Sequence, residues 1–372
     1  MDENVSKNRY QPRVASLPGA TLAEVLVARG MSQAELAQRM GRPKKTVNEI
    51  VKGKTAITPD TALELERVLG TPSAGFWIQR EQQYRESKAR ADEEQRLEEY
   101  EPAISKWNVP LGEMVKRGWI PTATSKTEKA RVLLSYFGVA SPENWNELYL
   151  APQAQWRRAA NVSEKTGKIA AWLRRGETQG QEIHTAPFDR EKFQVALRTI
   201  RDTLLRKTKV ADFLQAVQDL CAATGVAVVV VEEFPGAGIK AAARWLSPEK
   251  ALIQLSYRGN RLDIFWFNFF HEAGHVLLHG KRAVFLDEDS PAPDLAVEEA
   301  EADRFASDHL IDAKKLRAFC AYGVPSQEDV VRFAREIAVD PCIVVGRLRK
   351  IEHVAPAFGA ELMVDLGRKQ RK

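Results

Sequence analysis

The segment FHEAGHVLLH, residues 270–279, decides how the C-terminal part of this chain is built. Side chains four residues apart lie on one face of a helix, so His271 and His275 can direct imidazole nitrogens at one point. Glu272 lies beside that point. This spacing is typical of a zinc metalloprotease in which the carboxylate acts as general base. Because the chain has only six histidines, chance would produce the pattern on the order of 0.01 times.

A catalytic zinc site needs a third protein ligand, because zinc takes four ligands and keeps one position open for water. Lys281 stands where an HExxHxxGxxH enzyme would supply that ligand as histidine, which excludes this subclass. The segment EEAEADRFA, residues 298–306, predicts a second helix. On it Glu299 and Asp303 lie four residues apart and share a face. We predict Glu299 as the third ligand and Asp303 as the acceptor for the free N–H of His271.

Neighbouring residues compete for these roles. Glu298 and Glu301 are alternative ligands, about 100° and 200° around the helix from Glu299. We interpret His279 as a helix-end residue that caps backbone carbonyls. His309 is a candidate oxyanion donor whose position the sequence does not predict. The remaining histidines, read as ordinary surface residues, are His184 and His353.

The sequence HEAGHVLLH followed by EAEADRFASDHLI resembles the ImmA/IrrE family of metallopeptidases. The resemblance covers roughly residues 200 to 315. It implies that His271, His275 and Glu299 are zinc ligands and that Glu272 is catalytic. The chain departs from the family pattern at residues 308–312, where DHLID replaces an apolar run ending in Pro. We expect this departure to change a loop and to leave the metal site intact.

Residues 21–70 show a second pattern, that of four or five short helices. Ser32 begins the second helix after a turn at Gly30, and Thr58 with Pro59 begins the fourth. The third helix is expected from Pro43 through Val51, with its apolar residues inward. Its outward polar residues are Lys44, Lys45, Thr46, Asn48 and Lys52. Two short helices around a glycine turn, the second basic and amide-bearing, indicate a helix-turn-helix that enters the major groove of DNA.

The segment MSQAELAQRMGRPKKTVNEIVKGKTAITPDTALELERVLGT, residues 31–71, resembles the Xre/Cro-like repressors and more closely the HigA-type antitoxins. The resemblance places DNA contacts on Lys44, Lys45, Thr46 and Asn48. It departs at Arg42 and Pro43, where the family has an aliphatic residue and Ser. A small helical domain with a solvated basic face is the alternative. The charge of residues 1–80, twelve Lys and Arg against eight Asp and Glu, does not decide between the two readings, whereas the helix pattern favours DNA binding.

The whole chain is expected to be mostly α with a small β-sheet, an α+β protein of several domains. Strands are predicted at residues 226–231, 239–246 and 251–256, ahead of the HExxH helix. An edge strand of such a sheet can hold an extended peptide by strand addition. The expected domains are a helix-turn-helix domain at 14–80, a charged helical linker at 81–102, a helical accessory region at 103–200, the metallopeptidase at 201–325 and a C-terminal helical segment with a basic tail at 326–372.

Composition fits a cytoplasmic protein that meets polyanions. The 372 residues carry a formal charge of +5 and a sequence pI near 9.0. The sequence contains no apolar run of membrane-spanning length, and its polar start does not resemble a signal peptide. The three cysteines are widely spaced and odd in number, so reduced core residues are the simplest interpretation.

Together these patterns predict a DNA-binding transcriptional regulator with a zinc-dependent endopeptidase. The resemblance implies that the enzyme cleaves a repressor, or this chain itself, to relieve repression. The alternative is a HigA-type antitoxin or repressor whose peptidase-like domain senses a signal or binds a toxin without proteolysis. Expected partners are Zn²⁺, a double-stranded DNA operator, a protein substrate, a cognate toxin and a second copy of the chain in a homodimer.

Overall fold

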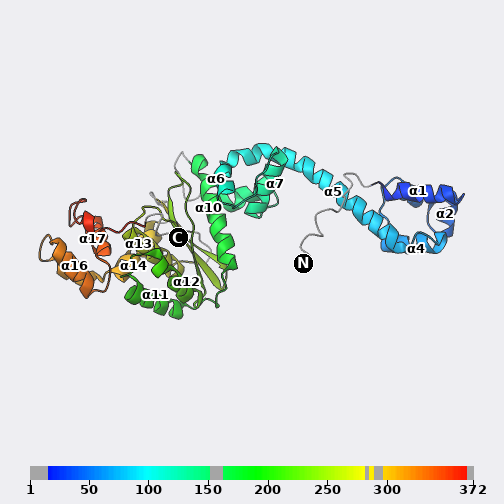
Figure 1. Ribbon diagram of the computed structural model, residues 1–372. Coiled ribbons are helices and arrows are strands. Elements are labelled where there is room, and N and C mark those ends of the chain that lie inside the picture. The colour runs from blue at the N-terminus through cyan, green and yellow to red at the C-terminus, as the bar shows by residue number, and fades with distance from the viewer. Residues whose placement is uncertain (1–15, 151–161, 281–284, 289–295, 367–372) are drawn as a thin grey trace, which may run out of the picture. The chain divides into compact units, whose positions relative to one another are not determined.

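The computed structural model describes residues 16–150, 162–280, 285–288 and 296–366. The chain divides into two compact units, Met1–Glu101 and Pro102–Lys372, each with its own hydrophobic core (Figure 1). Helices dominate both units, and the one sheet found in the described residues lies in the second, so the predicted α+β class is confirmed. None of the described helices has the length and apolar character needed to cross a membrane.

The N-terminal unit has the predicted five-helix pattern in its described residues. Its core is built on Leu22, Leu36, Val47, Leu65 and Trp77, all almost fully buried. Side chains at helix starts accept backbone N–H groups, as the sequence predicted for the second and fourth helices. The helices are α1 (Pro18–Ala28), α2 (Gln33–Arg39), α3 (Lys44–Val51), α4 (Pro59–Leu69) and α5 (Ala74–Ile104).

Helix α5 runs unbroken through the residues predicted to be a charged linker and across the boundary between the units. Ion pairs one turn apart, Glu81 with Arg85 at 2.7 Å and Glu86 with Arg90 at 2.7 Å, stabilise its exposed middle. Each such pair contributes about 0.3–0.5 kcal/mol. The segment is therefore helical through local contacts along its own surface.

The C-terminal unit begins with helices rich in buried tryptophan. Trp107 and Trp145 stack with ring centroids 4.4 Å apart, and Phe137 meets Trp107 edge-on. These ring contacts make the tryptophans part of the structural core of this region. The helices of this part are α6 (Leu111–Lys116), α7 (Lys126–Phe137), α8 (Pro142–Trp145), the π-helical turn η2 (Asn146–Leu150), α10 (Val162–Glu182), α11 (Arg190–Leu204) and α12 (Leu214–Ala222).

The sheet has four strands in the order β1-β3-β2-β4. Strands β1 (Val226–Val230), β2 (Ile239–Ser247) and β3 (Lys250–Leu255) confirm the three predicted strands, and β4 (Phe285–Glu288) was not predicted. Strand β3 pairs with β1 in parallel and with β2 in antiparallel register, while β4 pairs antiparallel with β2. The edge strands are therefore β1 and β4.

Helices cover both faces of the sheet because strand side chains alternate between them. On β3, Ile253 and Leu255 join the main core with the helix α13 (Leu262–Leu278). Gln254 points the other way, where its amide donates to the Trp172 carbonyl of α10 at 2.7 Å. Figure 1 shows α10 and α13 on opposite sides of the sheet. The sheet thus gives α13 a rigid support.

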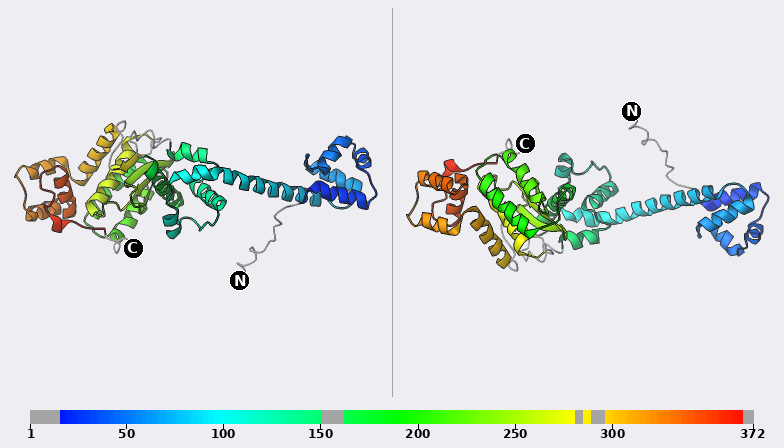
Figure 2. Two further views of the ribbon diagram at one scale, coloured as in Figure 1. Left: turned by 90° about the horizontal axis from the view of Figure 1, so that it is seen from above. Right: turned by 90° about the horizontal axis from the view of Figure 1, so that it is seen from below.

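The segments after α13 complete the C-terminal unit. Helix α14 (Ala296–Leu310) packs along α13, and α16 (Gln327–Glu336) and α17 (Pro341–Lys350) form a pair that contacts α13 through α17. Figure 2 shows this pair at one end of the unit from two directions. The side chains of Ser326 and Asp340 cap the starts of α16 and α17. The remaining helical segments of the described residues are α15 (Ala313–Cys320) and the short turns η1 (Ser105–Trp107), η3 (Val210–Asp212) and η5 (Ala360–Leu362).

Helices α13 and α14 are in close contact at Gly274. A Cβ atom there would lie 3.2 Å from the Phe305 ring and 3.3 Å from the Ala302 Cα. A leucine side chain has no room at this position. We expect Gly274→Leu to lower the free energy of unfolding by about 1–3 kcal/mol through overpacking, as measured by denaturant unfolding.

The matched control for this substitution is Gly112→Leu on α6, where a Cβ would have no neighbour within 4 Å. Both substitutions replace a glycine within a helix, and this replacement by itself stabilises the helix by about 0.5–1 kcal/mol. Equal stability of the two variants would contradict the close helix contact at Gly274.

Candidate metal centre

Helix α13 carries three titratable side chains into the interior of the C-terminal unit. His271, Glu272 and His275 are 2%, 0% and 2% exposed, respectively. The aromatic residues before them, Phe269 and Phe270 among others, anchor the helix in the core. Burial of a charged or polar group is costly without a partner, so the contacts of these three residues show what the site is built to hold.

Two imidazoles and one carboxylate converge at the site. His271 Nε2 lies 2.9 Å from His275 Nε2. The Glu299 carboxylate on α14 lies 3.2 Å from His271 Nε2 and 3.5 Å from His275 Nε2. One ligand atom from each of the three residues lies within 4.8 Å of the others. Among the described residues this is the one group of three or more His, Cys, Asp or Glu side chains with such a geometry.

The outward-facing ring nitrogens have their own contacts. His271 Nδ1 lies 3.0 Å from Asp303 Oδ1 on α14. His275 Nδ1 lies 2.8 Å from His279 Nδ1, and His279 Nε2 lies 3.2 Å from Glu301 Oε2. A carboxylate only accepts hydrogen bonds. The contacts are therefore satisfied when His271 Nδ1–H donates to Asp303, His275 Nδ1–H donates to His279, and His279 Nε2–H donates to Glu301.

This assignment leaves both inner Nε2 atoms of the neutral imidazoles as lone-pair donors aimed at one point. Nitrogen ligands 2.0–2.1 Å from a tetrahedral zinc ion lie about 3.3 Å apart, close to the separations found here. Carboxylate contacts behind ligating imidazoles are usual in zinc sites. The donor set of His271, His275 and Glu299 therefore fits a zinc ion, with Glu272 next in sequence to the first ligand.

The charge of Asp303 is maintained by its surroundings. Burial alone would raise the pKa of this carboxyl. The hydrogen bond from His271, the electrostatic interaction with that ring and the positive charges of Lys350 and Lys240 outweigh burial and hold the pKa below its ordinary value. An ionised Asp303 is the acceptor that orients the His271 ring.

The competing residues of the sequence analysis lie elsewhere. Glu301 contacts His279, and the half-exposed Glu298 contributes no atom to the group formed by His271, His275 and Glu299. His279 is the C-cap residue of α13, and its backbone N–H donates to the His275 carbonyl at 3.2 Å, which confirms the expectation of a helix-end residue. Its side chain contacts His275 and Glu301. His309 stacks on Phe305 with centroids 3.9 Å apart and contacts the backbone carbonyl of that residue at 2.9 Å.

The other two histidines lie away from these contacts. His184 is exposed, and His353 Nε2 lies 3.0 Å from the Gly323 carbonyl. The DHLI segment at residues 308–311, which departs from the family pattern, continues α14 to Leu310.

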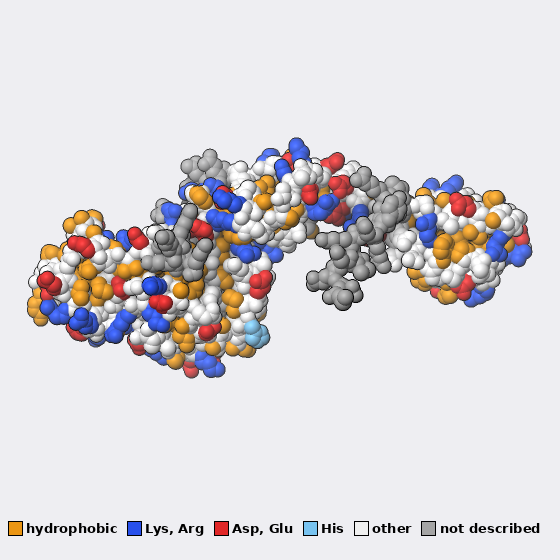
Figure 3. Space-filling view, in the orientation of Figure 1, with side chains coloured by type: hydrophobic (Ala, Val, Ile, Leu, Met, Phe, Trp, Pro, Cys, Tyr) orange, Lys and Arg blue, Asp and Glu red, His pale blue; other side chains and the backbone are white. Residues whose placement is uncertain are grey.

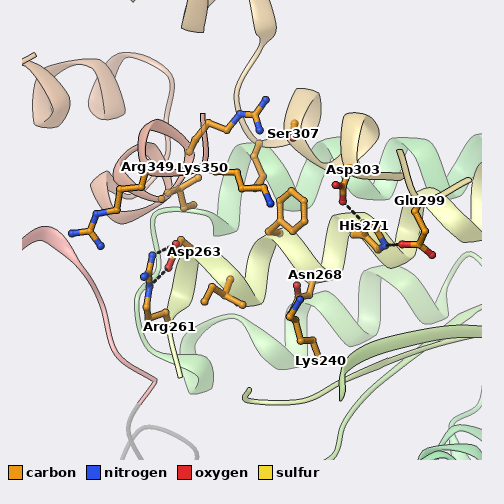
Figure 4. A pocket seen from close by; sticks show the side chains of 16 residues that line it. Lys240, Arg261, Asp263, Asn268, His271, Glu299, Asp303, Ser307, Arg349 and Lys350 are labelled. Carbon is orange, nitrogen blue, oxygen red and sulfur yellow. Dashed lines mark hydrogen bonds and ion pairs between the residues drawn. The ribbon is translucent and has the colours of Figure 1, made fainter. Parts of the chain in front are cut away.

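A pocket of about 610 Å³ is lined by two of the three converging side chains, His271 and Glu299. It lies between α13, α14, α17 and the start of β2, and His271, Glu299 and Asp303 form one end of it (Figure 4). Sequence reasoning missed its basic residues, because Lys240 and α17 are far from the HExxH segment in sequence. The lining residues with charged side chains are Lys240, Arg261, Asp263, Glu299, Asp303, Arg347, Arg349 and Lys350.

The predicted DNA contacts lie on or next to α3 in the N-terminal unit. Val47 and Ile50 face the core, which leaves the polar residues toward solvent. Lys44, Lys45 and Lys52 are exposed, and Thr46 and Asn48 are half-buried. The face of this unit visible in Figure 3 mixes basic, acidic and apolar side chains. Net charge alone therefore does not define a nucleic-acid surface here.

The chain carries two recognisable domains. Residues 22–76 match the family model described as helix-turn-helix, and residues 225–349 match the family model described as IrrE N-terminal-like domain, a metallopeptidase-like family. Over 55 residues the chain is 34% identical to virulence-associated protein A of Dichelobacter nodosus. That match covers 15% of this chain and 54% of the relative, so the chain spans about half the length of this curated relative.

Two solved structures are similar to about a quarter of the chain. An addiction module antidote protein of the HigA family from Coxiella burnetii is 32% identical, with 23% of this chain and 94% of that chain covered and a TM-score of 0.21. A protein described as an antidote of a plasmid maintenance system, from Nostoc punctiforme, is 24% identical, with 23% and 93% covered and a TM-score of 0.22.

The buried His275 makes the metal-free chain sensitive to acid. Burial first, and then the charges of His271 and His279, lower the pKa of His275 from 6.5 to about 2. The imidazole of His275 therefore binds a proton more tightly in the unfolded chain than in the folded one. The stability that its neutral form contributes to the folded chain is present above pH 6.5 and is lost as pH falls toward 2. We expect the free energy of unfolding in the presence of a chelator to fall by about 1.4 kcal/mol between pH 7.5 and 5.5.

The variants His275→Asn and His184→Asn separate this effect from the other titrating groups. Guanidinium unfolding of His275→Asn should depend less on pH, whereas His184→Asn removes an exposed imidazole and should behave as the parent chain does. The same pH dependence in both variants would show that another group causes the acid sensitivity.

Proposed function

We propose that this chain, which joins a helix-turn-helix domain to an IrrE N-terminal-like domain, is a DNA-binding transcriptional regulator with a zinc-dependent endopeptidase. In this proposal the peptidase cleaves a repressor protein, or the chain itself, and relieves repression. The observation that carries it is the convergence of His271 Nε2, His275 Nε2 and the Glu299 carboxylate on one point. Three such donors around an open position are the ligand set of a catalytic zinc site.

A zinc ion held by these donors would polarise the scissile carbonyl and lower the pKa of water beside it. Glu272 would accept the proton of the attacking water and deliver it to the leaving amine, as general base and then general acid. Asp303 and the His279–Glu301 pair would fix the tautomer and the orientation of both imidazoles. Burial of all three residues of α13 limits access of bulk water to the reaction.

The proposal assigns DNA recognition to α3. Its exposed Lys44 and Lys45 suit phosphate contacts, and Asn48 suits the bidentate recognition of a base edge. Thr46 and Lys52 complete the proposed surface. Binding to a palindromic operator would require two copies of the chain. The unit that carries α3 packs Val47 and Ile50 inward, which supports this division between core and contact residues.

A non-proteolytic regulator is the competing proposal. In that case the C-terminal domain would sense a signal or bind a toxin, and it would cleave no protein. The buried Glu272 beside the first imidazole favours the enzyme, because a module that only binds has no need for a base at that position.

The substitution Glu272→Gln tests the assigned base. We expect it to leave zinc content and DNA affinity unchanged while it lowers cleavage by at least about 10²-fold, the usual contribution of a general base. Zinc is measured by elemental mass spectrometry, and cleavage by mass spectrometry of the purified chain incubated alone and with the proteins encoded beside its gene.

Glu336→Gln provides the control, because it removes an exposed carboxylate on α16 outside the pocket. Cleavage that persists in Glu272→Gln would refute the assigned base. A parent chain that binds zinc but cleaves none of these proteins would favour the non-proteolytic regulator.

The assignment of α3 is tested with an operator selected from a random duplex library. We expect Asn48→Ala to weaken binding to the selected operator by about 1–3 kcal/mol and to relax the base preference at one position of that operator. Lys44→Ala should weaken binding to all DNA sequences by a similar factor. It should also reduce the slope of the logarithm of affinity against the logarithm of salt concentration by about one. The control is Arg67→Ala, which removes an exposed charge on α4. Equal losses in Arg67→Ala and Lys44→Ala would contradict a contact surface on α3.

A further inference from the structure

The pocket beside the candidate metal centre carries more basic than acidic groups. Five cationic side chains line it, against three acidic ones. The cations come from β2, the start of α13 and the last turn of α17, three segments far apart in the chain. They are Lys240, Arg261, Arg347, Arg349 and Lys350.

The three acidic side chains are already engaged. Glu299 lies against the two imidazoles, and Asp303 accepts from His271. Asp263 forms an ion pair with Arg261, with one contact at 2.9 Å. The three acidic side chains cannot neutralise all five cationic ones. A carboxylate that enters the pocket therefore meets an excess of positive charge.

Among the cations, Arg349 is also held in place. Its guanidinium donates two hydrogen bonds to the Phe358 carbonyl, at 3.0 and 2.6 Å. Arg347 and Lys350 make no hydrogen bond or ion pair through their side chains to the part of the chain that the structure describes. Arg347 is half-buried and Lys350 is exposed.

The cationic side chains line the same space as His271 and Glu299. Figure 4 shows His271 and Glu299 at one end of the pocket, with Arg349, Lys350 and the Arg261–Asp263 pair toward the other. Apolar residues, Ile264, Phe267, Leu310 and Ile343, line the space with them.

We infer that this pocket is a subsite for a carboxylate of the peptide substrate, with Arg347 and Lys350 as its specificity-determining residues. The inference rests on the proposed peptidase function and names the substrate class of that site. The carboxylate can come from an Asp or Glu side chain or from the C-terminus of the peptide. About 610 Å³ is enough for one such side chain and its neighbours. A lining that includes two proposed zinc ligands places the bound group next to the reacting bond.

Peptide hydroxamates provide the probe, because the hydroxamate binds zinc and makes affinity measurable without turnover. One series carries Glu, and a matched series carries Gln, at each position one to three residues from the hydroxamate. A third series carries Gln and ends in a free carboxylate in place of an amide. Binding to the zinc-loaded full chain is measured by calorimetry at 50 and 500 mM salt.

We expect one Glu compound, or one compound with a free C-terminus, to bind about tenfold more tightly than its neutral match at low salt. The preference should shrink at high salt, because exposed charges are screened. Arg347→Gln with Lys350→Gln should abolish it while the neutral compounds keep their affinity. Arg335→Gln, which removes an exposed charge on the neighbouring helix α16, should preserve it.

The outcomes separate the subsite from the function on which it rests. If acidic and neutral hydroxamates bind with equal affinity whatever the position of the carboxylate, the carboxylate subsite is wrong but the zinc site is supported. If no hydroxamate binds in the presence of zinc, both proposals fall. If Arg347→Gln with Lys350→Gln instead weakens binding to the selected operator and leaves hydroxamate preference unchanged, these cations contact nucleic acid and the subsite is wrong.

Discussion

The C-terminal unit depends on the close contact between α13 and α14. The contact brings a carboxylate from one helix within 3.5 Å of two imidazole nitrogens on the other. Three electron-pair donors held this near one another in a buried place repel unless a cation or a proton lies between them. The sheet behind α13 and the absence of a side chain at Gly274 allow the helices to keep this distance.

The features predicted well from sequence are those fixed by local patterns. A nearly continuous run of β-branched residues predicted β1, and a capping residue predicted the start of α4. The spacing of His271 and His275 follows from helix geometry alone. These features depend on residues within one or two turns of each other, so one sequence is enough to find them.

Features that depend on distant segments were not predicted. Strand β4 is four residues long and gains its identity from pairing with β2. The side-chain contact of His279 with Glu301 was not predicted, because it joins two helices and leaves no signal in the sequence of either one. The basic lining of the pocket is another such case, since Lys240 and Lys350 are brought together by the packing of β2, α13 and α17.

The N-terminal unit shows how a departure from a family pattern can be accommodated. Arg42, where an aliphatic residue is usual, forms an ion pair with Glu64 of α4 at 2.6 Å. Pro43 takes the extended conformation before the first turn of α3, with φ of −60°, which suits proline. The entry to α3 therefore relies on a polar contact between helices in place of an apolar one.

The continuity of α5 constrains when the chain could act on itself. A peptide that binds by adding a strand to a sheet edge must be extended, and a helical segment is not. A bond within residues 81–101 would become accessible only after several turns had unwound, and the Glu–Arg pairs along the helix oppose that opening. The rate of any self-cleavage in this segment would be limited by the local unfolding of α5. A ligand that stabilises the helical form of α5 would therefore slow self-cleavage.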